Sequence, residues 1–523
     1  KEGTGVAALA MEGGGFRALS SDAAIIAGLL AASSPLTASP TLAGSKLLDK
    51  FDVISSVSGS SWFSAGLIYS QKFQQLIEDI ADSPRTASTQ FGQGFTTPWL
   101  LAANADPSLY STIVKELASM NVALVEDLKL TSFVLSTGTS WNTCIGALLN
   151  ATCGIVPTDA LGQPPASGPD GAWAEGKKWL VDHSVMLPTG GLEATVFKGR
   201  LGLPHITYTA DFGTDVPQYL PASFSVTVGA GLTSTAPVPY ISRDVQASLK
   251  KLQYTATIVP YLDVIKAESG PFLGAFGSSI EELAGTLPIA YVASASSAAA
   301  GDLAYDSNLA TDILALIKGK LTPWVANAAG NDAFQDADQM VADFNNWNGV
   351  NKDSVTALGQ SAVHGAVDGG FADGTGISPA LAAGADEVLV ILNSNVTNDP
   401  TFIQRLFPGG IQPSYKPNVS GLFPVFSAPS AAEVSTQVVN LHRLEIPNGC
   451  EFLDTLAVGS LTGTTIDNKY FGIEGGRTVT LNIINVGSSL SIGTNEDFAN
   501  YNVLVQDVMD TILFDSNADF VAN

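Results

Sequence analysis

The chain has 523 residues, of which 46% are hydrophobic and 14% are charged, and this composition is typical of a packed globular protein. Its formal net charge is −25, and Lys and Arg form no cluster, which excludes the positive surface that nucleic-acid binding requires. The same acidity disfavours electrostatic docking on anionic membranes. No transmembrane segment is predicted, because the longest apolar runs, Ala23–Ala32 and Leu287–Ala300, are shorter than the roughly 18 to 20 residues needed or too rich in Ala and Ser.

The first motif is a glycine-rich loop between a strand and a helix. Residues Val6–Met11 predict a buried strand, and after Glu12 the chain continues as Gly13-Gly14-Gly15-Phe16-Arg17 before a helix predicted over Ala18–Ala31. The backbone N–H groups of such a loop form an anion site at the positive end of the helix. The anion could be a phosphate or a developing oxyanion. The alternative is a turn that only lets strand and helix pack.

The second motif is a sharp strand-to-helix turn. The run Phe51–Ser55 predicts a buried strand, small residues follow from Ser56 to Ser60, and an apolar helical pattern then continues to Tyr69. This order is typical of a nucleophile elbow, in which small neighbours let strand and helix approach closely and Ser58 is exposed at the tip. Serines replace both glycines of the usual Gly-x-Ser-x-Gly pattern. Similar serine-rich turns also occur without a nucleophile, so the motif depends on its partners.

The middle of the chain alternates helical patterns with loops. The segment Gly154–Gly176 is so rich in Pro and Gly that we expect an exposed excursion or lid. Helices are predicted over Leu109–Met120, Asn308–Ile317 and Asp332–Trp347, and strands over Pro204–Phe212 and Ala222–Val228.

The third motif is Asp368-Gly369-Gly370, which offers a carboxylate at the start of a loop. The loop is followed by a short helical pattern, Ser378–Ala383, and a strand, Glu387–Asn393. Strands and helices interleave throughout, which predicts an α/β architecture. Further elements are predicted towards the C-terminus: strands over Gln437–Ile446 and Thr478–Val486, and an amphipathic helix over Asn500–Phe514 with Asp507 and Asp510 on its solvated face.

Together, the motifs GGGFR (13–17), SVSGS (56–60) and DGG (368–370) resemble those of patatin-like and cytosolic phospholipase A catalytic domains, including fungal lysophospholipases. The long interval between the second and third motifs, more than half of the chain, resembles the cytosolic phospholipase branch. The resemblance covers about a third of the chain. It implies a three-layer α/β fold with a central, mainly parallel sheet, flanking helices and an inserted cap or lid. We expect residues 1–523 to form one large catalytic domain, with cap insertions within residues 85–350.

The resemblance also assigns roles to single residues. It implies that Ser58 is the nucleophile, that Asp368 takes its proton directly in a Ser-Asp dyad, and that the N–H groups of Gly14 and Gly15 form the oxyanion hole. Arg17 would either face the phosphate of a phospholipid or steady the glycine loop. The implied function is a lipid acyl hydrolase of the phospholipase A or lysophospholipase type, with its lipid substrate at a membrane or micelle interface and no cofactor or metal.

Two other functions fit the same residues. One is a lipid storage or lipid-binding protein with little turnover, and the other is an acyltransferase that passes the acyl group from the same acyl-enzyme to an alcohol. The lipid class, the acyl position and the oligomeric state stay open.

The remaining candidates have simpler interpretations. The histidines His183, His205, His364 and His442 follow no metal spacing, and we expect them to be structural, although His442 could complete a Ser-His-Asp triad. Cys144 and Cys153 could form a local disulfide or stay as thiols like Cys450. The sequons at Asn150, Asn395 and Asn418 occur at about the frequency expected by chance. We favour a secreted or organellar location.

Overall fold

The computed structural model describes the following residues: 5–33, 39–102, 141–186, 193–198, 204–209, 219–236, 259–260, 288–298, 324–327, 363–393, 401–410, 424–439, 442–445, 453–468, 471–488 and 501–514. The predicted helices at residues 109–120, 308–317 and 332–347 lie outside these residues, as do Asn395, Asn418 and Cys450.

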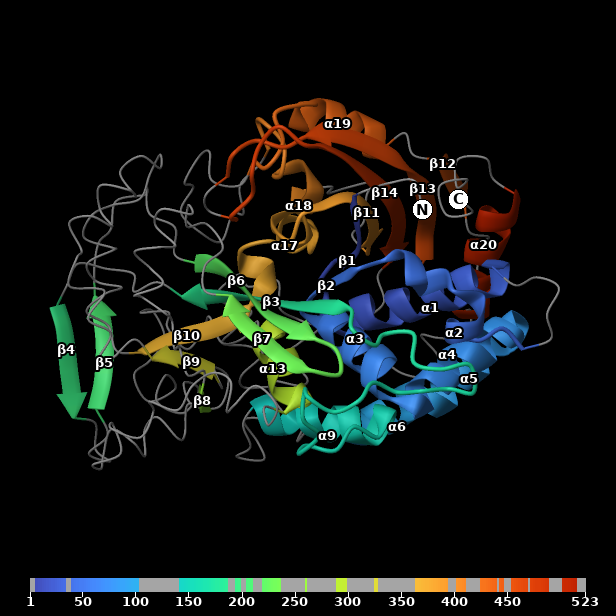
Figure 1. Cartoon of the computed structure of the whole chain (residues 1–523), viewed down its shortest axis with the longest axis horizontal. Coiled ribbons are helices and arrows are strands. Elements are labelled where there is room, and N and C mark those ends of the chain that lie inside the picture. Colours follow the sequence, from blue (N-terminus) through green and yellow to red (C-terminus); the bar gives the residue numbers. More distant parts are fainter. Residues whose placement is uncertain are drawn as a thin grey trace.

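The centre of the fold is a parallel sheet (Figure 1). Its five strands lie in the order β14-β11-β1-β2-β3, and each is parallel to its neighbours. A parallel centre covered on both faces explains the nearly continuous apolar runs of β1 and of the second half of β11. The five strands are β1 (Val6–Met11), β2 (Val53–Val57), β3 (Lys178–Met186), β11 (Ala385–Leu392) and β14 (Thr478–Ser488).

Antiparallel strands extend this centre on both sides, so the whole sheet is mixed. Beyond β14 lie β13 (Leu453–Thr464) and β12 (His442–Glu445). On the other side, β3 pairs with β6 and β10, and these are followed by the outer strands. The remaining strands are β6 (Tyr219–Thr227), β7 (Gly231–Ala236), β8 (Val259–Pro260), β9 (Trp324–Asn327) and β10 (Val363–Asp368), with β4 (Glu193–Lys198) and β5 (Pro204–Thr209) in a separate pair.

Helices cover both faces of the sheet (Figure 1), and each face has its own cluster of buried apolar residues. Rings of Phe16, Trp62 and Trp99 meet in the larger cluster, with centroids 5.2 to 5.3 Å apart. The larger cluster is covered by α1 (Gly15–Ser33), α3 (Gly59–Tyr69), α4 (Gln71–Asp82), α5 (Ala87–Phe91), α6 (Thr97–Ala102), α9 (Trp141–Cys153), α13 (Ile289–Ser296) and α20 (Tyr501–Phe514). The smaller cluster is covered by α17 (Ile377–Ala382), α18 (Thr401–Gln404) and α19 (Ala431–Val439).

Several predicted elements are confirmed close to their predicted bounds. The strand predicted over Val6–Met11 is β1 without any change, and the elbow residues form β2 and α3. The prediction over Gln437–Ile446 was wrong in its first part, because α19 continues to Val439 before β12 begins at His442. The apolar spacing of that stretch suits the last turn of a helix as well as a strand.

The helix α1 corrects the statement that no apolar segment is long enough to cross a membrane. The helix spans Gly15–Ser33. Within the described residues it is the one helix that is long and apolar enough to cross a membrane, judged by length and composition. However, 94% of its apolar window is buried inside the protein, where it packs against α3, α4 and α20. Its apolar character is therefore accounted for by the core.

The segment Gly154–Gly176, expected to be an exposed excursion or lid, is mostly exposed or half-buried, but several side chains along it are buried. Leu161 is fully buried, and its carbonyl accepts a hydrogen bond from the Tyr69 hydroxyl at 3.2 Å. The N–H of Ala166 donates to the carbonyl of Ile68 at 2.9 Å, and Trp173 is 6% exposed. Apolar side chains at intervals along the segment therefore anchor it to the end of α3.

Cys144 and Cys153 do not form a disulfide, since Cys153 is a free, buried thiol. Both residues lie on α9, nine positions apart. A helix rises about 1.5 Å per residue, so their Cα atoms are about 13 Å apart. A disulfide requires less than about 7 Å.

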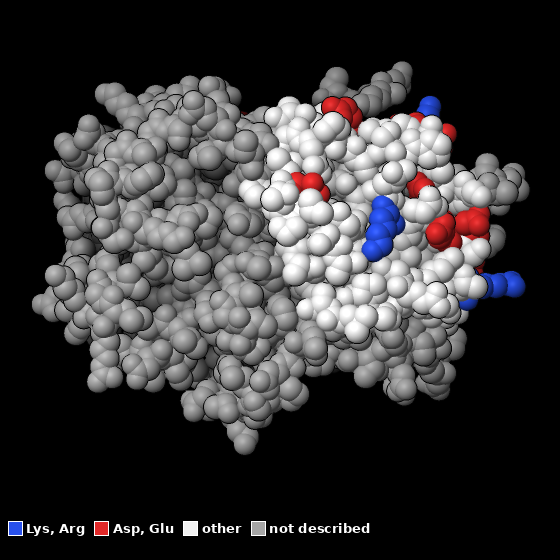
Figure 2. All heavy atoms as spheres, turned by 90° about the horizontal axis from the view of Figure 1, so that it is seen from below, with Lys and Arg blue, Asp and Glu red and all other residues white. Residues whose placement is uncertain are grey.

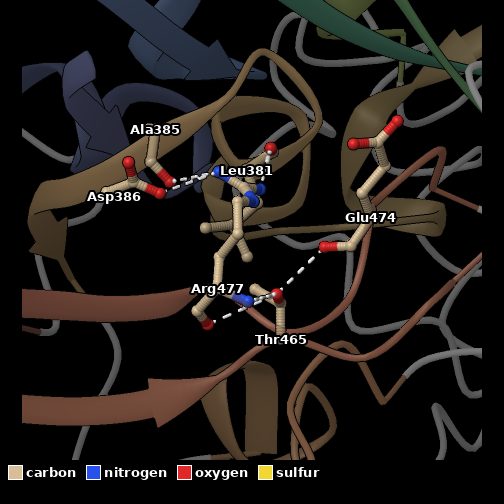
Figure 3. A network of polar contacts seen from close by, with 6 residues as sticks. All are labelled: Leu381, Ala385, Asp386, Thr465, Glu474 and Arg477. Atoms are coloured by element: carbon tan, nitrogen blue, oxygen red, sulfur yellow. Dashed lines mark hydrogen bonds and ion pairs between the residues drawn. The ribbon is translucent and has the colours of Figure 1, made fainter. Parts of the chain in front are cut away.

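Arg477 joins the end of α17 to the start of β11 (Figure 3). Its guanidinium donates to the carbonyls of Leu381 and Ala385 at 2.6 and 3.1 Å, and to the Asp386 carboxylate at 3.0 Å. A cation at a helix C-terminus adds a charged donor to the last carbonyls, and here the carbonyl of Leu381 also accepts from the N–H of Gly384 at 3.0 Å. This contact fixes the chain just after the Asp368 loop.

Uncharged residues dominate the described part of the face shown in Figure 2, where Asp, Glu, Lys and Arg appear only in small, scattered groups. This agrees with the low charged fraction of the sequence.

Candidate active site

The geometry of the candidate site follows from β2 and β10, whose carboxyl ends meet along the same edge of β3. Along one edge of β3, Val57 at the end of β2 lies opposite Asp182, and Asp368 at the end of β10 lies opposite His183. The other edge of β3 is occupied by β6 over its full length. The residue that follows β2, Ser58, therefore lies next to Asp368. Its hydroxyl donates a hydrogen bond of 2.6 Å to Oδ2 of Asp368, across 310 residues of sequence.

Ser58 has the backbone conformation expected of a nucleophile elbow. Its φ is 55° and its ψ is −123°, a region that non-glycine residues rarely adopt, and α3 begins at the next residue. A Cβ on Gly59 would lie 1.8 Å from the carbonyl oxygen of Gly15, and one on Gly13 would lie 3.0 Å from Cβ of Ser58. The glycine loop and the elbow are thus in direct contact, which requires glycine at position 59 and leaves little room for a side chain at position 13.

A serine network holds the elbow in this strained conformation. The N–H of Ser58 donates to Oγ of Ser296 at 2.9 Å, and the hydroxyl of Ser61 donates to the same oxygen at 2.9 Å. Ser296 in turn donates to the carbonyl of Asp182 on β3 at 2.5 Å. Ser296 is the last residue of α13, so this helix connects the elbow to the sheet.

The electrostatics of Asp368 favour a proton acceptor near neutral pH. Burial raises the pKa of Asp368 to about 6, against hydrogen bonds from Ser58 and from the N–H of Gly370 that lower it. Asp368 is 6% exposed, and Ser58 is 5% exposed. The acid therefore ionises below neutral pH but is a stronger base than an ordinary aspartate.

Two of the histidines, His183 and His442, do not complete a triad with Ser58 and Asp368. His183 lies opposite Asp368, but its ring stacks on Phe224 with centroids 4.3 Å apart, and within the described residues no hydrogen bond joins it to Ser58 or Asp368. Burial lowers the pKa of His183 to about 4. His442 is on β12, which β13, β14, β11 and β1 separate from β2, so the triad hypothesis for it was wrong. His205 lies on β5 in the separate two-stranded sheet.

The glycine loop presents two N–H groups at the start of α1. Gly14 and Gly15 have φ values of 146° and 58°, whereas the N–H of Gly13 already donates to the carbonyl of Gly374 at 2.8 Å. Among the described residues, none accepts a hydrogen bond from the N–H of Gly14 or Gly15. The loop that carries these two N–H groups contacts the elbow at Gly13 and Gly59, at the positive end of a 19-residue helix.

Arg17 lies over this loop in the first turn of α1. Its Nε donates to Oδ1 of Asn393 at 3.0 Å, and its Nη2 would lie 3.0 Å from a Cβ on Gly14. This contact fits the interpretation that Arg17 steadies the loop. The alternative role, at the phosphate of a substrate, stays a prediction.

Sequence reasoning missed two residues of this site, Ser296 and Asn393. Ser296 lies in an Ala- and Ser-rich stretch that has no motif of its own. Asn393 was noted only as the last residue of a predicted strand, although a polar residue at the carboxyl end of a parallel strand is a signal for a site. No group of His, Cys, Asp and Glu that could hold a metal is found in the described part of the chain.

Comparisons with known proteins give little further information. No family model and no curated protein matches the chain. Among solved structures, the chain is similar to human GIVD cytosolic phospholipase A2, with a TM-score of 0.36 and 12% sequence identity over 99% of this chain. The chain spans 62% of the length of that structure. A likeness this distant does not assign a fold family or a function.

Proposed function

We propose that the protein is a lipid acyl hydrolase in which Ser58 is the nucleophile and Asp368 the general base. The observation that carries the proposal is the 2.6 Å hydrogen bond from the Ser58 hydroxyl to Asp368, made at a strained elbow beside the glycine loop. A buried pair of this kind, with donors for a developing negative charge, is what acyl transfer requires.

In the proposed mechanism, Asp368 accepts the hydroxyl proton while Oγ of Ser58 attacks the ester carbonyl. The N–H groups of Gly14 and Gly15 bind the resulting oxyanion. When the tetrahedral intermediate collapses, the ester bond breaks, the departing alcohol takes the proton from Asp368, and the acyl group remains on Ser58. Asp368 then accepts a proton from water as the water attacks the acyl-enzyme. Collapse of the second intermediate returns that proton to Ser58 and releases the fatty acid.

A carboxylate is a weak base for a serine hydroxyl, so the site must compensate. Burial contributes by raising the pKa of Asp368 to about 6, which strengthens the base while leaving it ionised at neutral pH. The second contribution comes from the glycine loop, because oxyanion donors fixed in advance supply the largest single stabilisation in many acyl-transfer enzymes.

The lipid substrate is proposed from the resemblance of the three motifs to phospholipase A domains and from Arg17, whose guanidinium lies at the rim of the glycine loop. The finer parts of the proposal are a patatin-like, cytosolic phospholipase A-type domain with a cap inside residues 85–350. Of that range, β3 belongs to the central sheet, so the cap would lie on either side of this strand. A secreted or organellar location also stays a prediction.

The test is fatty-acid release from phospholipid, lysophospholipid, galactolipid and triacylglycerol, measured without added metal. Wild type runs beside Ser58→Ala and beside Ser64→Ala, a buried serine of α3 whose hydroxyl, among the described residues, hydrogen-bonds to the carbonyl of Ser60 alone. Release that disappears in Ser58→Ala and persists in Ser64→Ala supports the proposal. Equal fatty-acid release from Ser58→Ala and wild type would contradict the proposed function. Adding an alcohol acceptor separates hydrolysis from acyl transfer.

A further inference from the structure

The glycine loop needs support from outside itself. The φ values of Gly14 and Gly15, 146° and 58°, are accessible because glycine has no Cβ, but the same freedom allows their peptide groups to turn. An oxyanion donor is effective only when its N–H already points at the developing charge. Contacts to the loop from elsewhere in the fold therefore decide whether the donors are aimed correctly.

Asn393 supplies such contacts from the carboxyl end of β11. It is fully buried, and its Nδ2 lies 3.1 Å from the carbonyl oxygen of Glu12 and 3.2 Å from that of Gly13. Its backbone N–H donates to the Glu12 carboxylate at 2.6 Å. The residue thus holds the chain at the point where β1 gives way to the loop.

The orientation of the Asn393 amide is fixed by Arg17. The Nε of Arg17 is a donor only, and it lies 3.0 Å from Oδ1 of Asn393. The opposite end of the amide, Nδ2, must then face the two carbonyls, where it can donate. The assignment of oxygen and nitrogen in this side chain is therefore consistent with all of its partners.

One of these carbonyls controls a proposed oxyanion donor directly. The carbonyl of Gly13 and the N–H of Gly14 belong to the same planar, trans peptide group and point in opposite directions. Within the described residues, Asn393 is the sole hydrogen-bond donor to the Gly13 carbonyl. Fixing this oxygen fixes the direction of the Gly14 N–H, and a hydrogen bond to the carbonyl also polarises the N–H as a donor.

We propose that Asn393 is a positioning residue, which aims the Gly14 N–H at the oxyanion by anchoring the peptide group between Gly13 and Gly14. This inference rests on the proposed ester hydrolysis. The preceding peptide group has further support, because the Ser60 hydroxyl donates to the Glu12 carbonyl at 2.7 Å and Gly13 donates to Gly374. Loss of Asn393 therefore releases mainly the Gly13–Gly14 peptide.

The test compares Asn393→Leu and Asn393→Asp with wild type on p-nitrophenyl butyrate, a small ester without a head group. Leu has a similar size without a polar group, and Asp keeps the acceptor for Arg17 but loses the donor. Intact sites are counted by titration with a fluorophosphonate, so that kcat is expressed per reactive Ser58. We expect kcat to fall about 10- to 100-fold in both variants, with KM within about twofold of wild type.

The matched control is Asn485→Leu. Asn485 is also fully buried, lies on the neighbouring strand β14 opposite Leu392, and its side chain has no hydrogen-bond partner among the described residues. It is expected to keep the wild-type kcat per titrated site. If Asn393→Leu yields no protein that reacts with the fluorophosphonate, the kcat of Asn393→Asp alone tests the inference. Wild-type kcat in the Asn393 variants overturns this inference alone, whereas wild type without Ser58-dependent hydrolysis overturns the proposed function together with it.

Discussion

Asp368 lies directly opposite His183 where β10 and β3 pair, yet burial shifts the pKa values of these two neighbours in opposite directions. Burial raises the pKa of the acid to about 6 and lowers that of the imidazole to about 4. Above the lower of these values His183 is neutral. A single group of the pair, Asp368, therefore changes charge close to neutral pH.

This predicts the pH dependence of hydrolysis. Asp368 must be ionised to accept the Ser58 proton, so kcat/KM should rise with pH and reach half of its plateau near a pH of about 6. The measurement is kcat/KM on a neutral ester across this range, for wild type and for His183→Gln. The same midpoint is expected in both. A midpoint that moves with His183, or a flat profile, would contradict the assignment.

The raised pKa also predicts a stability gain when the acid is removed. The folded protein binds the carboxyl proton of Asp368 more tightly than the unfolded chain does. Asp368 therefore lowers the free energy of unfolding as pH rises from about 3.8 to about 6, and the full cost remains at higher pH. Asp368→Asn is neutral at every pH, so its free energy of unfolding at neutral pH should be higher by about 1 to 3 kcal/mol, while ester hydrolysis is lost. Thermal unfolding at several pH values tests this, and a lower Tm than wild type at neutral pH would refute it.

Gly14→Ala should affect catalysis more than stability. A Cβ at this position meets Oδ1 of Asn393 at 2.7 Å and the Arg17 guanidinium at 3.0 Å, so the loop must shift. We expect kcat to fall at least about 100-fold, as when an oxyanion donor is lost. Gly154→Ala is the control, because its φ of 74° is also left-handed but nothing lies within 4 Å. Both variants should lose about 1 kcal/mol of stability, and only Gly14→Ala should lose activity.

Arg477→Met is expected to destabilise the protein without changing kcat per titrated site. The variant leaves the carbonyls of Leu381 and Ala385 without their charged donor, which costs about 1 to 3 kcal/mol in the free energy of unfolding. Asp386→Asn removes only the ion pair, whose side chains are 26% and 42% exposed, and should cost less than about 1 kcal/mol. Chemical unfolding compares the two, and equal losses would show that the ion pair, rather than the carbonyl contacts, stabilises this junction.

The parts of the site that sequence could predict are those with local causes. A glycine loop after β1, a strained serine between β2 and α3, and an aspartate before two glycines each need particular residue types at fixed spacing. The sequence does not contain the relationship between them. Nothing in the run Val363–Asp368 says that β10 is antiparallel to β3 or that it ends opposite His183. That pairing depends on contacts between segments far apart in the chain.

The same reason explains the errors and omissions. Ser296 and Asn393 hydrogen-bond to backbone groups of segments far away in the sequence, so the residues next to them in sequence do not indicate these contacts. β13 was not predicted, because its Gly and Thr residues weaken the apolar pattern of a strand that is held by pairing with β14. Cys144 and Cys153 looked close in sequence, but the helix between them keeps them apart.

The meeting of β2 and β10 along one edge of β3 has a consequence for the protein while it is being made. Ser58 is synthesised before Asp368, the residue 310 positions later that accepts its hydrogen bond, and β3, the strand that aligns the two, lies between them in sequence. A nascent chain that carries the elbow and the glycine loop therefore has no partner for its serine. The Ser58 hydroxyl gains its partner Asp368 only after β10 has been synthesised and has paired with β3.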